Sequence, residues 1–548
     1  MTLGKRSAQR SLFEPDLYLT RRVRQDSFYG FLAREPLFSD EEFSELYTLD
    51  NGRPSVPPSL LATALLLQTH DSVSDEEAKA RADFDLRWKF ALGVALDEAP
   101  FAKSTLQTFR AQLVLHDKLQ QVFRRSLDLA REKGYLKDIR ATDGSEGQAD
   151  ERRKVKLALD TSYILGRGAV KDTYNLLGDG IVSLLRTLAS LAGEAPESWA
   201  KAHALERYLD ATHSLKGGAG IDWEDQTARE AFLTGIVNDA DSLLGIARET
   251  LADYAEESRE HQRLKAAAGL LGALLLQDVE RTAGGAKIRQ GTAKDRIVSV
   301  TDPEMRSGHK SKSKRFEGHK AAIAVEPQSQ LITAVDVLAG NAQDYEQALD
   351  LVKASEANLG VEVAETIGDC AYGEGTTRQA FADEDRRLIA KMPSQPNGAY
   401  FAKEDFTIDP VAKTCVCPAG HTASTLVKLS GQHGRTPPLF GFRFECTDCP
   451  LKARCVRAKS GGRTVSLHPQ EALRQQARAF QKSQAFAPYR TLRQAAEHRL
   501  ARLIQLGMRQ ARYFGRAKTK GQLLLTAALA NLTLLARALG PPRRSATT

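Results

Sequence analysis

The sequence predicts a mixed α/β domain preceded by an all-α region, and three observations lead to this prediction. Residues 1–145 have the pattern of short helices. From residue 155 onward, short apolar runs of strand character alternate with helical stretches. The last part of the chain is basic and has helical periodicity. A chain of 548 residues also exceeds the usual size of one hydrophobic core, so we expect more than one domain.

The first region, residues 1–145, is expected to be a small helical domain. A helix is predicted over residues 59–70 after a proline-rich turn, a second helix is capped by Ser74, and a third begins at Ser104. Several short helices that expose arginine suit a DNA-binding module. The same pattern also fits a helical bundle that only packs on the next domain.

The second region, residues 150–540, carries the strands. In order, the sequence predicts a strand at 155–160, a helical stretch at 173–279, a hairpin of strands at 319–325 and 331–337, a helix at 344–358, a strand at 365–369, a helix at 376–383 and a strand at 387–391. This order is that of a ribonuclease H-like mixed sheet. We therefore expect a ribonuclease H-like catalytic domain with a helical insertion at residues 173–295 and a cysteine-rich insertion at residues 395–468.

Three acidic residues are candidate catalytic residues. Asp160 and Asp369 each end an apolar strand, where a carboxylate is costly unless it is paired or coordinated. Glu497 is the only acid among residues 472–548, which contain fifteen Arg and Lys residues, and it lies in a predicted helix. Carboxylates from separate elements can hold Mg²⁺ ions that bracket the two oxygens of a phosphodiester displacement. Glu497 taken alone could equally be a salt-bridge partner.

Two further acids compete with these three. Asp336 also lies in a predicted strand and is the alternative for the second metal ligand. Asp172 follows Asp160 closely enough to support the metal ligands from behind. For both residues a structural role is the simpler interpretation.

The acids lie in sequence blocks that can be compared with known families. The blocks surround Asp160 (Leu-Ala-Leu-Asp-Thr-Ser), Asp369 (Ile-Gly-Asp-Cys-Ala-Tyr-Gly) and Glu497, which follows Tyr489 and Arg493. Further segments that agree are residues 53–110, 316–320 and 339–344. In this order the blocks resemble the DDE transposases of bacterial insertion sequences, whose N-terminal domain is of the InsH type.

The resemblance implies a metal-dependent enzyme that acts on double-stranded DNA. Two Mg²⁺ (or Mn²⁺) ions would be held by Asp160, Asp369 and Glu497, and a metal-activated water would cut the terminal inverted repeats of a transposon. The freed 3′-hydroxyl would then attack target DNA, within a synaptic complex that implies a homodimer. Two alternatives stay open: a nuclease of the same fold, retained by its host, that cuts but does not join, and a DNA-binding regulator with an inactive site.

The resemblance also implies DNA contacts near the third acid. Tyr489 and Arg493 match accessory residues of the family. The lysine that follows the third acid in the family is absent, and Ile504 stands about where it would fall. Arg499 and Arg502 are the candidates to replace it.

Basic residues elsewhere are candidate phosphate contacts. The basic run at residues 306–315 is expected to be a flexible loop before the hairpin, and the segment at residues 509–518 mixes aromatic and basic residues. The residues that we single out are Lys310, Lys312, Lys314, Arg315, Lys320 and Arg512. A solvated charged loop is the alternative for the first run.

Five of the six cysteines lie close together in the cysteine-rich insertion. They are Cys415, Cys417, Cys446, Cys449 and Cys455. Two short cysteine turns can supply four ligands to a tetrahedral structural Zn²⁺ ion, and His421 and His433 are further candidate ligands. Reduced thiols without a metal are the alternative. Cys370 is expected to be a packed neighbour of Asp369 and not a nucleophile.

Charge and hydropathy indicate the setting of the protein. The chain has 77 Lys and Arg against 69 Asp and Glu, and a pI of about 9.0, which suits a polyanionic partner. The N-terminus lacks the apolar core of a secretory signal, and polar residues interrupt the most apolar run, at residues 523–539. We therefore expect a cytoplasmic, nucleoid-associated bacterial protein without a membrane partner.

Overall fold

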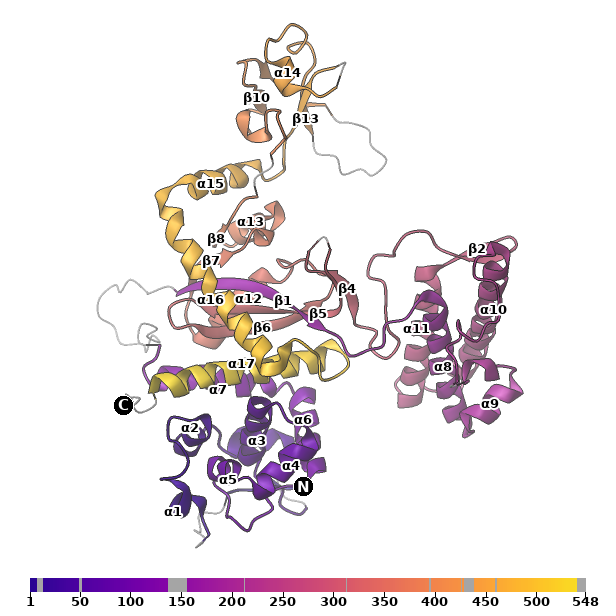
Figure 1. Cartoon of the computed structure of the whole chain (residues 1–548), viewed down its shortest axis with the longest axis vertical. Coiled ribbons are helices and arrows are strands. Elements are labelled where there is room, and N and C mark those ends of the chain that lie inside the picture. The colour runs from indigo at the N-terminus through magenta and orange to yellow at the C-terminus, as the bar shows by residue number, and fades with distance from the viewer. Residues whose placement is uncertain are drawn as a thin grey trace.

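The structure, a computed structural model, consists of a central α/β body with three parts attached to it. The described residues are 1–6, 13–48, 52–136, 155–210, 212–311, 313–393, 396–424, 426–427, 438–458 and 461–539. In Figure 1 the N-terminal helices lie below the central sheet, a helical arm extends to one side, and a small β-rich module lies at the far end. Lys312 and His433 lie outside the described residues.

The central sheet has six strands and a mixed arrangement. Its strands are β1 (Val155–Leu165), β4 (Arg306–His309), β5 (Arg315–Glu326), β6 (Leu331–Ala339), β7 (Val363–Gly368) and β8 (Arg387–Ala390). The order is β6-β5-β1-β7-β8, with β4 also on β5; β1 is antiparallel to β5 and parallel to β7. The helices α12 (Ala348–Leu359) and α13 (Gly375–Asp383) and the short η3 (Ala371–Gly373) connect the last strands. The mixed α/β fold with a helical N-terminal region is therefore confirmed, and it is consistent with a ribonuclease H-like fold.

Strand β4 is a correction to the sequence analysis, which expects residues 306–315 to be a flexible loop. Arg306–His309 instead pairs with the start of β5. Glycines allow this close pairing: a Cβ on Gly318, where φ is +152°, would lie 2.1 Å from the Ile164 carbonyl oxygen, and one on Gly308 would lie 2.2 Å from the Gly340 carbonyl oxygen. A strand built from glycine and polar residues lacks the β-branched and apolar residues by which strands are predicted.

Helix α17 (Arg516–Leu539) joins the sheet to the N-terminal helices. Its length and apolarity would suffice for a membrane span, but 78% of that apolar window is buried inside the fold, so it is a core helix. It packs on β6 and on α7 (Leu119–Glu132). Asn531 shows how close the fit is: its amide accepts a hydrogen bond from the Ile332 N–H at 2.9 Å and donates to the Ile332 carbonyl and to Ser126.

The N-terminal region is a bundle of short helices around α3. Its elements are α1 (Pro15–Leu19), α2 (Phe28–Arg34), η1 (Glu41–Leu46), α3 (Pro58–Asp71), α4 (Asp75–Phe84), α5 (Leu86–Leu92) and α6 (Lys103–Leu115), followed by α7. The side chain of Ser74 accepts a hydrogen bond from the Glu77 N–H, as expected for the cap of α4. Eleven residues of α3 are buried, which makes it the central helix of the bundle.

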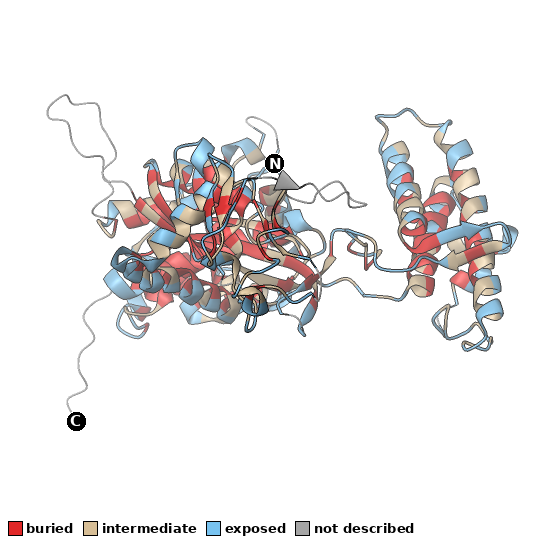
Figure 2. Cartoon of the chain, turned by 90° about the horizontal axis from the view of Figure 1, so that it is seen from above, coloured by how far each residue is buried: buried red, intermediate tan, exposed pale blue. Residues whose placement is uncertain are grey.

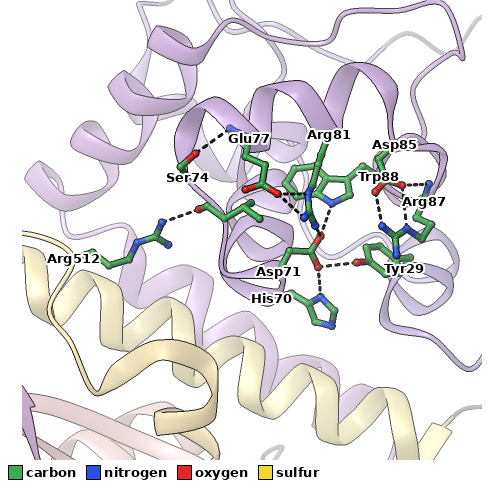
Figure 3. A network of polar contacts seen from close by, with 11 residues as sticks. Tyr29, His70, Asp71, Ser74, Glu77, Arg81, Asp85, Arg87, Trp88 and Arg512 are labelled. Carbon is green, nitrogen blue, oxygen red and sulfur yellow. Dashed lines mark hydrogen bonds and ion pairs between the residues drawn. The ribbon is translucent and has the colours of Figure 1, made fainter.

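A single carboxylate, Asp71, ties four of these helices together (Figure 3). It accepts hydrogen bonds from Tyr29, Arg81 and Trp88 at 2.5–2.8 Å, and His70 lies at 2.7 Å. Burial by itself would raise the pKa of Asp71, but the hydrogen bonds from these four side chains outweigh burial and lower the pKa. Asp71 is therefore held as a carboxylate at the centre of the bundle.

The helical arm between β1 and β4 has a core of its own. Its elements are α8 (Thr173–Ala192), α9 (Pro196–Ala202), η2 (Glu206–Tyr208), α10 (Gln226–Leu251), α11 (Arg259–Asp278) and the hairpin β2 (Val279–Thr282) and β3 (Gly285–Ile288). Figure 2 shows its buried residues separate from those of the central body. At the base of the arm, Asp278 accepts hydrogen bonds from Arg296 at 2.5 and 2.8 Å and from Thr173 at 3.0 Å, which fixes the start of α8 against the end of α11.

The remaining elements lie between β8 and α17. The β-rich module contains η4 (Lys403–Asp405), β9 (Thr407–Asp409), β10 (Thr414–Val416), β11 (Thr422–Ala423), β12 (Leu426–Val427), β13 (Leu439–Phe442), α14 (Lys452–Cys455) and β14 (Arg463–Ser466). The chain then returns to the sheet through α15 (Glu471–Lys482), η5 (Gln484–Phe486), α16 (Ala487–Leu503) and η6 (Ile504–Met508). Helix α16 crosses the sheet and packs on β1 (Figure 1).

Candidate active site

Two of the three predicted acids lie side by side on neighbouring strands. The parallel strands β1 and β7 pair Ala158 with Ile367, and Asp160 and Asp369 each follow two residues later. Each carboxylate accepts one nearby backbone hydrogen bond at 2.8 Å, Asp160 from the Thr161 N–H and Asp369 from the Ala371 N–H. Adjacent parallel strands thus bring both acids to the same edge of the sheet.

The pKa of Asp160 responds to the charges around it, including that of the third acid. Burial raises the pKa of Asp160 to about 7; the Thr161 N–H opposes this shift, the charge of Asp369 adds to it, Arg493 opposes it and Glu497 adds to it. The charges of Asp369 and Glu497 thus both act against the charged form of Asp160, whereas that of Arg493 favours it.

Glu497 lies on α16 and pairs with a residue one turn earlier. Its carboxylate forms an ion pair with the Arg493 guanidinium at 2.5 Å, and the Glu497 side chain is 45% exposed. Among the residues that the structure describes, no three His, Cys, Asp or Glu side chains lie close enough to hold a metal ion as they stand. For Glu497 to act as a ligand, the pair with Arg493 has to open.

A buried tyrosine lies behind the two aspartates. Tyr372 is fully buried, and within the described part of the chain its hydroxyl has no hydrogen-bond partner. A Cβ on Gly368 would lie 2.6 Å from the Tyr372 Cβ, so glycine makes room for the ring just before Asp369. Burial raises the pKa of Tyr372 well above its usual value, and the charges of Asp160, Asp344 and Asp369 raise it further. Sequence analysis does not single out Tyr372, although it lies in the Asp369 block.

The residues at this edge fit a divalent cation. Mg²⁺ takes oxygen ligands, and the three carboxylates supply them from three separate elements. The raised pKa of Asp160 means that its charge lacks compensation, which a nearby cation would provide. The hydroxyl of Tyr372 adds an unsatisfied oxygen in the same place.

The rival acids lie elsewhere. Asp336 in β6 pairs with Ala322 in β5, which pairs with Thr161 in β1, whereas Asp160 pairs with Ile323. Since neighbouring residues of a strand point to opposite faces, Asp336 and Asp160 lie on opposite faces of the sheet. On its face, Asp336 forms an ion pair with Lys520 at 3.0 Å. Asp172 caps α8 by accepting hydrogen bonds from the N–H groups of Tyr174 and Asn175. Both residues have structural partners.

A cluster of cations and one aromatic ring lies at the carboxyl end of β1. Arg509, Lys310 and Lys314 lie 3.8, 5.3 and 5.6 Å from the centre of the Tyr163 ring. Arg509 also donates a hydrogen bond to the Tyr163 carbonyl at 2.8 Å. Lys310 and Lys314 are exposed, as is Arg315. We call Tyr163, Lys310, Lys314 and Arg509 the β1-end cluster; sequence analysis does not single out Tyr163.

Four of the expected DNA contacts are buried or have partners within the fold, and their contacts with DNA stay predictions. Tyr489 is 9% exposed, and its hydroxyl donates a hydrogen bond to Glu365 at 2.7 Å. Lys320 pairs with Asp344 at 2.8 Å. Arg499 is 7% exposed, and burial lowers its pKa to about 10, with Arg502 next in effect. Arg512 donates to the Val73 carbonyl at 2.7 Å, which joins the C-terminal region to the N-terminal bundle (Figure 3).

Comparisons with known sequences give two matches. Residues 416–536 match the family described as "Transposase DDE domain", and residues 20–112 match the family described as "Transposase domain (DUF772)". No curated protein and no solved structure matches the chain. The first match includes Glu497 and the β-rich module from residue 416 onward, and the second covers most of the N-terminal bundle. Together these matches show that the chain is a relative of the DDE transposases of the insertion-sequence type.

Proposed function

We propose that this transposase cuts DNA at the ends of a mobile element and joins the cut ends to target DNA, with Asp160, Asp369 and Glu497 holding Mg²⁺ or Mn²⁺. The observation that carries the proposal is that Asp160 on β1 and Asp369 directly after β7 lie at one edge of the sheet. The charges of Asp369 and of Glu497 on α16 both raise the pKa of Asp160. Such a group of carboxylates repels itself unless a cation joins it.

The chain's own residues have definite tasks in this reaction. Divalent ions at the site would polarise the phosphodiester and activate the attacking water or 3′-hydroxyl. Asp160, with its pKa of about 7, would release its proton as it becomes a ligand. Arg493 would release Glu497 and turn to a DNA phosphate, since a guanidinium binds either anion in the same geometry.

The β1-end cluster would guide the DNA strand toward the acids. Tyr163 follows Asp160 by three residues, about 10 Å along β1, and its side chain points to the other face of the strand, so DNA would pass the end of β1 between the cluster and the acids. The exposed ammonium groups of Lys310 and Lys314 can neutralise phosphates, and the Tyr163 ring offers a surface for a base. In solution, two copies of the chain would be needed to hold the two ends of one element.

The test compares the three acids with a rival acid of the same sheet. Asp160→Asn, Asp369→Asn and Glu497→Gln should each abolish cleavage of DNA that carries the element's ends, in Mg²⁺ and in Mn²⁺. Asp336→Asn is the matched control, because it changes a strand carboxylate on the opposite face, and it should retain cleavage. Undiminished cleavage in any of the three variants would remove that residue from the site.

A second assay separates the joining enzyme from the two alternatives. Supplied with pre-cut ends, a transposase produces joined DNA, whereas a nuclease of the same fold does not. A DNA-binding regulator would bind without metal and produce no nick at any enzyme concentration. The three acids of the site favour the enzyme over the regulator.

A further inference from the structure

The β-rich module between residues 396 and 468 has little to hold it together besides its cysteines. Among the described residues its hydrophobic core consists of ten buried residues, and three of these are Cys415, Cys446 and Cys455. Its strands form two separate three-stranded sheets of short strands. Small modules with so small an apolar core usually need disulfides or a metal ion for stability. The cysteines that the structure describes are all free thiols.

Four of the five cysteines line one small pocket, and the fifth does not. Cys417, Cys446, Cys449 and Cys455 form the wall of this pocket together with the exposed His421. Cys415 is fully buried in the core of the module and lies outside the pocket wall. Cys417, Cys446, Cys449 and Cys455 are therefore the four cysteines that share this pocket. We call these four residues the thiol pocket.

Three separate backbone segments deliver the four thiols. Cys417 begins a tight turn in which its carbonyl accepts a hydrogen bond from the Gly420 N–H at 2.9 Å, with Gly420 at a φ of +86°. Cys446 and Cys449 lie three residues apart after β13, and Cys455 ends α14. The Arg463 N–H donates a hydrogen bond to the Cys446 sulfur at 3.5 Å.

The pocket wall also contains polar atoms without partners. Arg463 Nε and Glu445 Oε2 are buried, and neither has a hydrogen-bond partner within the described part of the chain. Both residues line the thiol pocket. Unsatisfied buried polar groups are rare in native proteins and commonly mark the place of an ion or water molecule. An anionic metal–thiolate centre would supply the Arg463 guanidinium with a counter-charge.

We propose that Cys417, Cys446, Cys449 and Cys455 bind one structural Zn²⁺ ion and that Cys415 is not a ligand. Four thiolates at about 2.3 Å complete the tetrahedral shell of zinc and leave no open position, which is typical of a structural site. The four sulfurs do not stand at ligand distance from one point among the described residues, so they would close on the ion by rotation about their Cα–Cβ bonds. The ion would then join the β10 turn, the β13 end and α14.

The experiment measures the zinc content of purified chains by mass spectrometry of the metal. We expect one Zn²⁺ per chain in the wild type. Each single serine variant of the thiol pocket should lose most of it: Cys417→Ser, Cys446→Ser, Cys449→Ser and Cys455→Ser. Cys415→Ser is the matched control, a buried thiol two residues from Cys417, and it should retain one Zn²⁺. A wild type without zinc, or a Cys415→Ser chain that loses it, would overturn the proposal.

A second measurement starts from the wild type and does not use the serine variants of the thiol pocket. Cobalt exchanged into the wild type should give the intense thiolate-to-metal absorption of a four-sulfur site, and Cys415→Ser should leave that spectrum unchanged. Cys449→His should keep the metal and weaken the absorption, because imidazole replaces one sulfur. A three-sulfur spectrum in the wild type would contradict the assignment. His421→Ala and Asp160→Asn should both retain zinc, which excludes His421 and the acid site as its ligands; neither measurement requires DNA cleavage.

Discussion

Two buried aspartates, Asp71 in the N-terminal bundle and Asp160 in the central sheet, show opposite electrostatics. Asp71 has three hydrogen-bond donors and His70 around it, and these lower its pKa against the effect of burial. Asp160 accepts one backbone hydrogen bond, from Thr161, and burial raises its pKa to about 7. The same residue type is therefore kept ionised in one place and kept close to neutral in the other.

The difference teaches which buried acid is available for chemistry. An acid whose oxygens already accept hydrogen bonds from donors within the fold contributes to stability and has no free oxygen to bind a metal ion. An acid that lies beside other acids and lacks donors reduces stability until a cation arrives. The charges of Asp369 and Glu497 next to Asp160 therefore mark the candidate active site more clearly than the presence of an aspartate does.

The largest expected effect separates the two aspartates by activity and stability. Asp160→Asn should reduce DNA cleavage about a thousandfold or more, as the loss of a central catalytic group commonly does. It should leave the chain folded. Asp71→Asn should instead lower the free energy of unfolding by roughly 3 kcal/mol, because it leaves Arg81 and its neighbours without their anion.

The measurement for this contrast is denaturant unfolding alongside a cleavage assay on the folded fraction. Once corrected for that fraction, the Asp71→Asn chain should cleave DNA about as well as the wild type. If Asp160→Asn unfolded the chain as Asp71→Asn does, the distinction between a catalytic and a structural aspartate would be lost.

The pH dependence of stability should also differ in sign between the two residues. Asp160 is protonated in the fold up to a pKa of about 7, so its stabilising effect is present at acid pH and is lost as the pH rises from about 4 through 7. In the absence of Mg²⁺ and Mn²⁺, Asp160→Asn should therefore match the wild type near pH 4 and exceed it by roughly 3–4 kcal/mol at pH 8. The pKa of Asp71 is lowered, so its contribution is present above pH 4 and is lost as the pH falls further. A constant difference between wild type and Asp160→Asn from pH 5 to 8 would contradict the raised pKa.

The elements around Asp160 and Asp369 are predictable from the sequence because their signals are local. Short apolar strands that end in an acid identify both aspartates, and the structure has strands at Val155–Leu165 and Val363–Gly368. The hairpin of β5 and β6 is likewise confirmed. The strand β4 is missed because its sequence, Arg-Ser-Gly-His, has no apolar or β-branched residue, yet Gly308 lets the backbones approach.

The partners of individual side chains are not predictable in the same way. Arg512 looks like a phosphate contact in the sequence, but it donates to the Val73 carbonyl, 439 positions away. Tyr489 likewise bonds Glu365. Residue type indicates charge and hydrogen-bonding capacity, whereas the tertiary fold decides which partner uses it. The roles of Asp160, Asp369 and Glu497 as metal ligands stay predictions.

Two tyrosines sharpen the comparison of the two aspartates. The Tyr29 hydroxyl donates to Asp71 at 2.7 Å, whereas the buried Tyr372 hydroxyl has no partner among the described residues. Tyr29→Phe should therefore destabilise the chain by about 1–2 kcal/mol, and Tyr372→Phe should be neutral or stabilise it by about 1 kcal/mol, because it removes an unsatisfied group. Urea unfolding of both variants measures this. Equal destabilisation by the two would show that Tyr372 has a partner in solution.

The smallest expected effect concerns the cations beside the two acids. Arg81 is committed to Asp71, whereas Lys310 in the β1-end cluster is exposed and contacts only the Tyr163 ring face among the interactions described for it. If Lys310 contacts a DNA phosphate, Lys310→Gln should reduce the slope of log affinity against log salt by about 0.9. Arg81→Gln should leave the slope unchanged and lower stability. DNA-binding titrations of both variants at salt concentrations of roughly 50 to 300 mM give both slopes. An unchanged slope for Lys310→Gln would place the DNA away from the end of β1. It would contradict the proposal that the DNA strand passes the β1-end cluster on its way to Asp160.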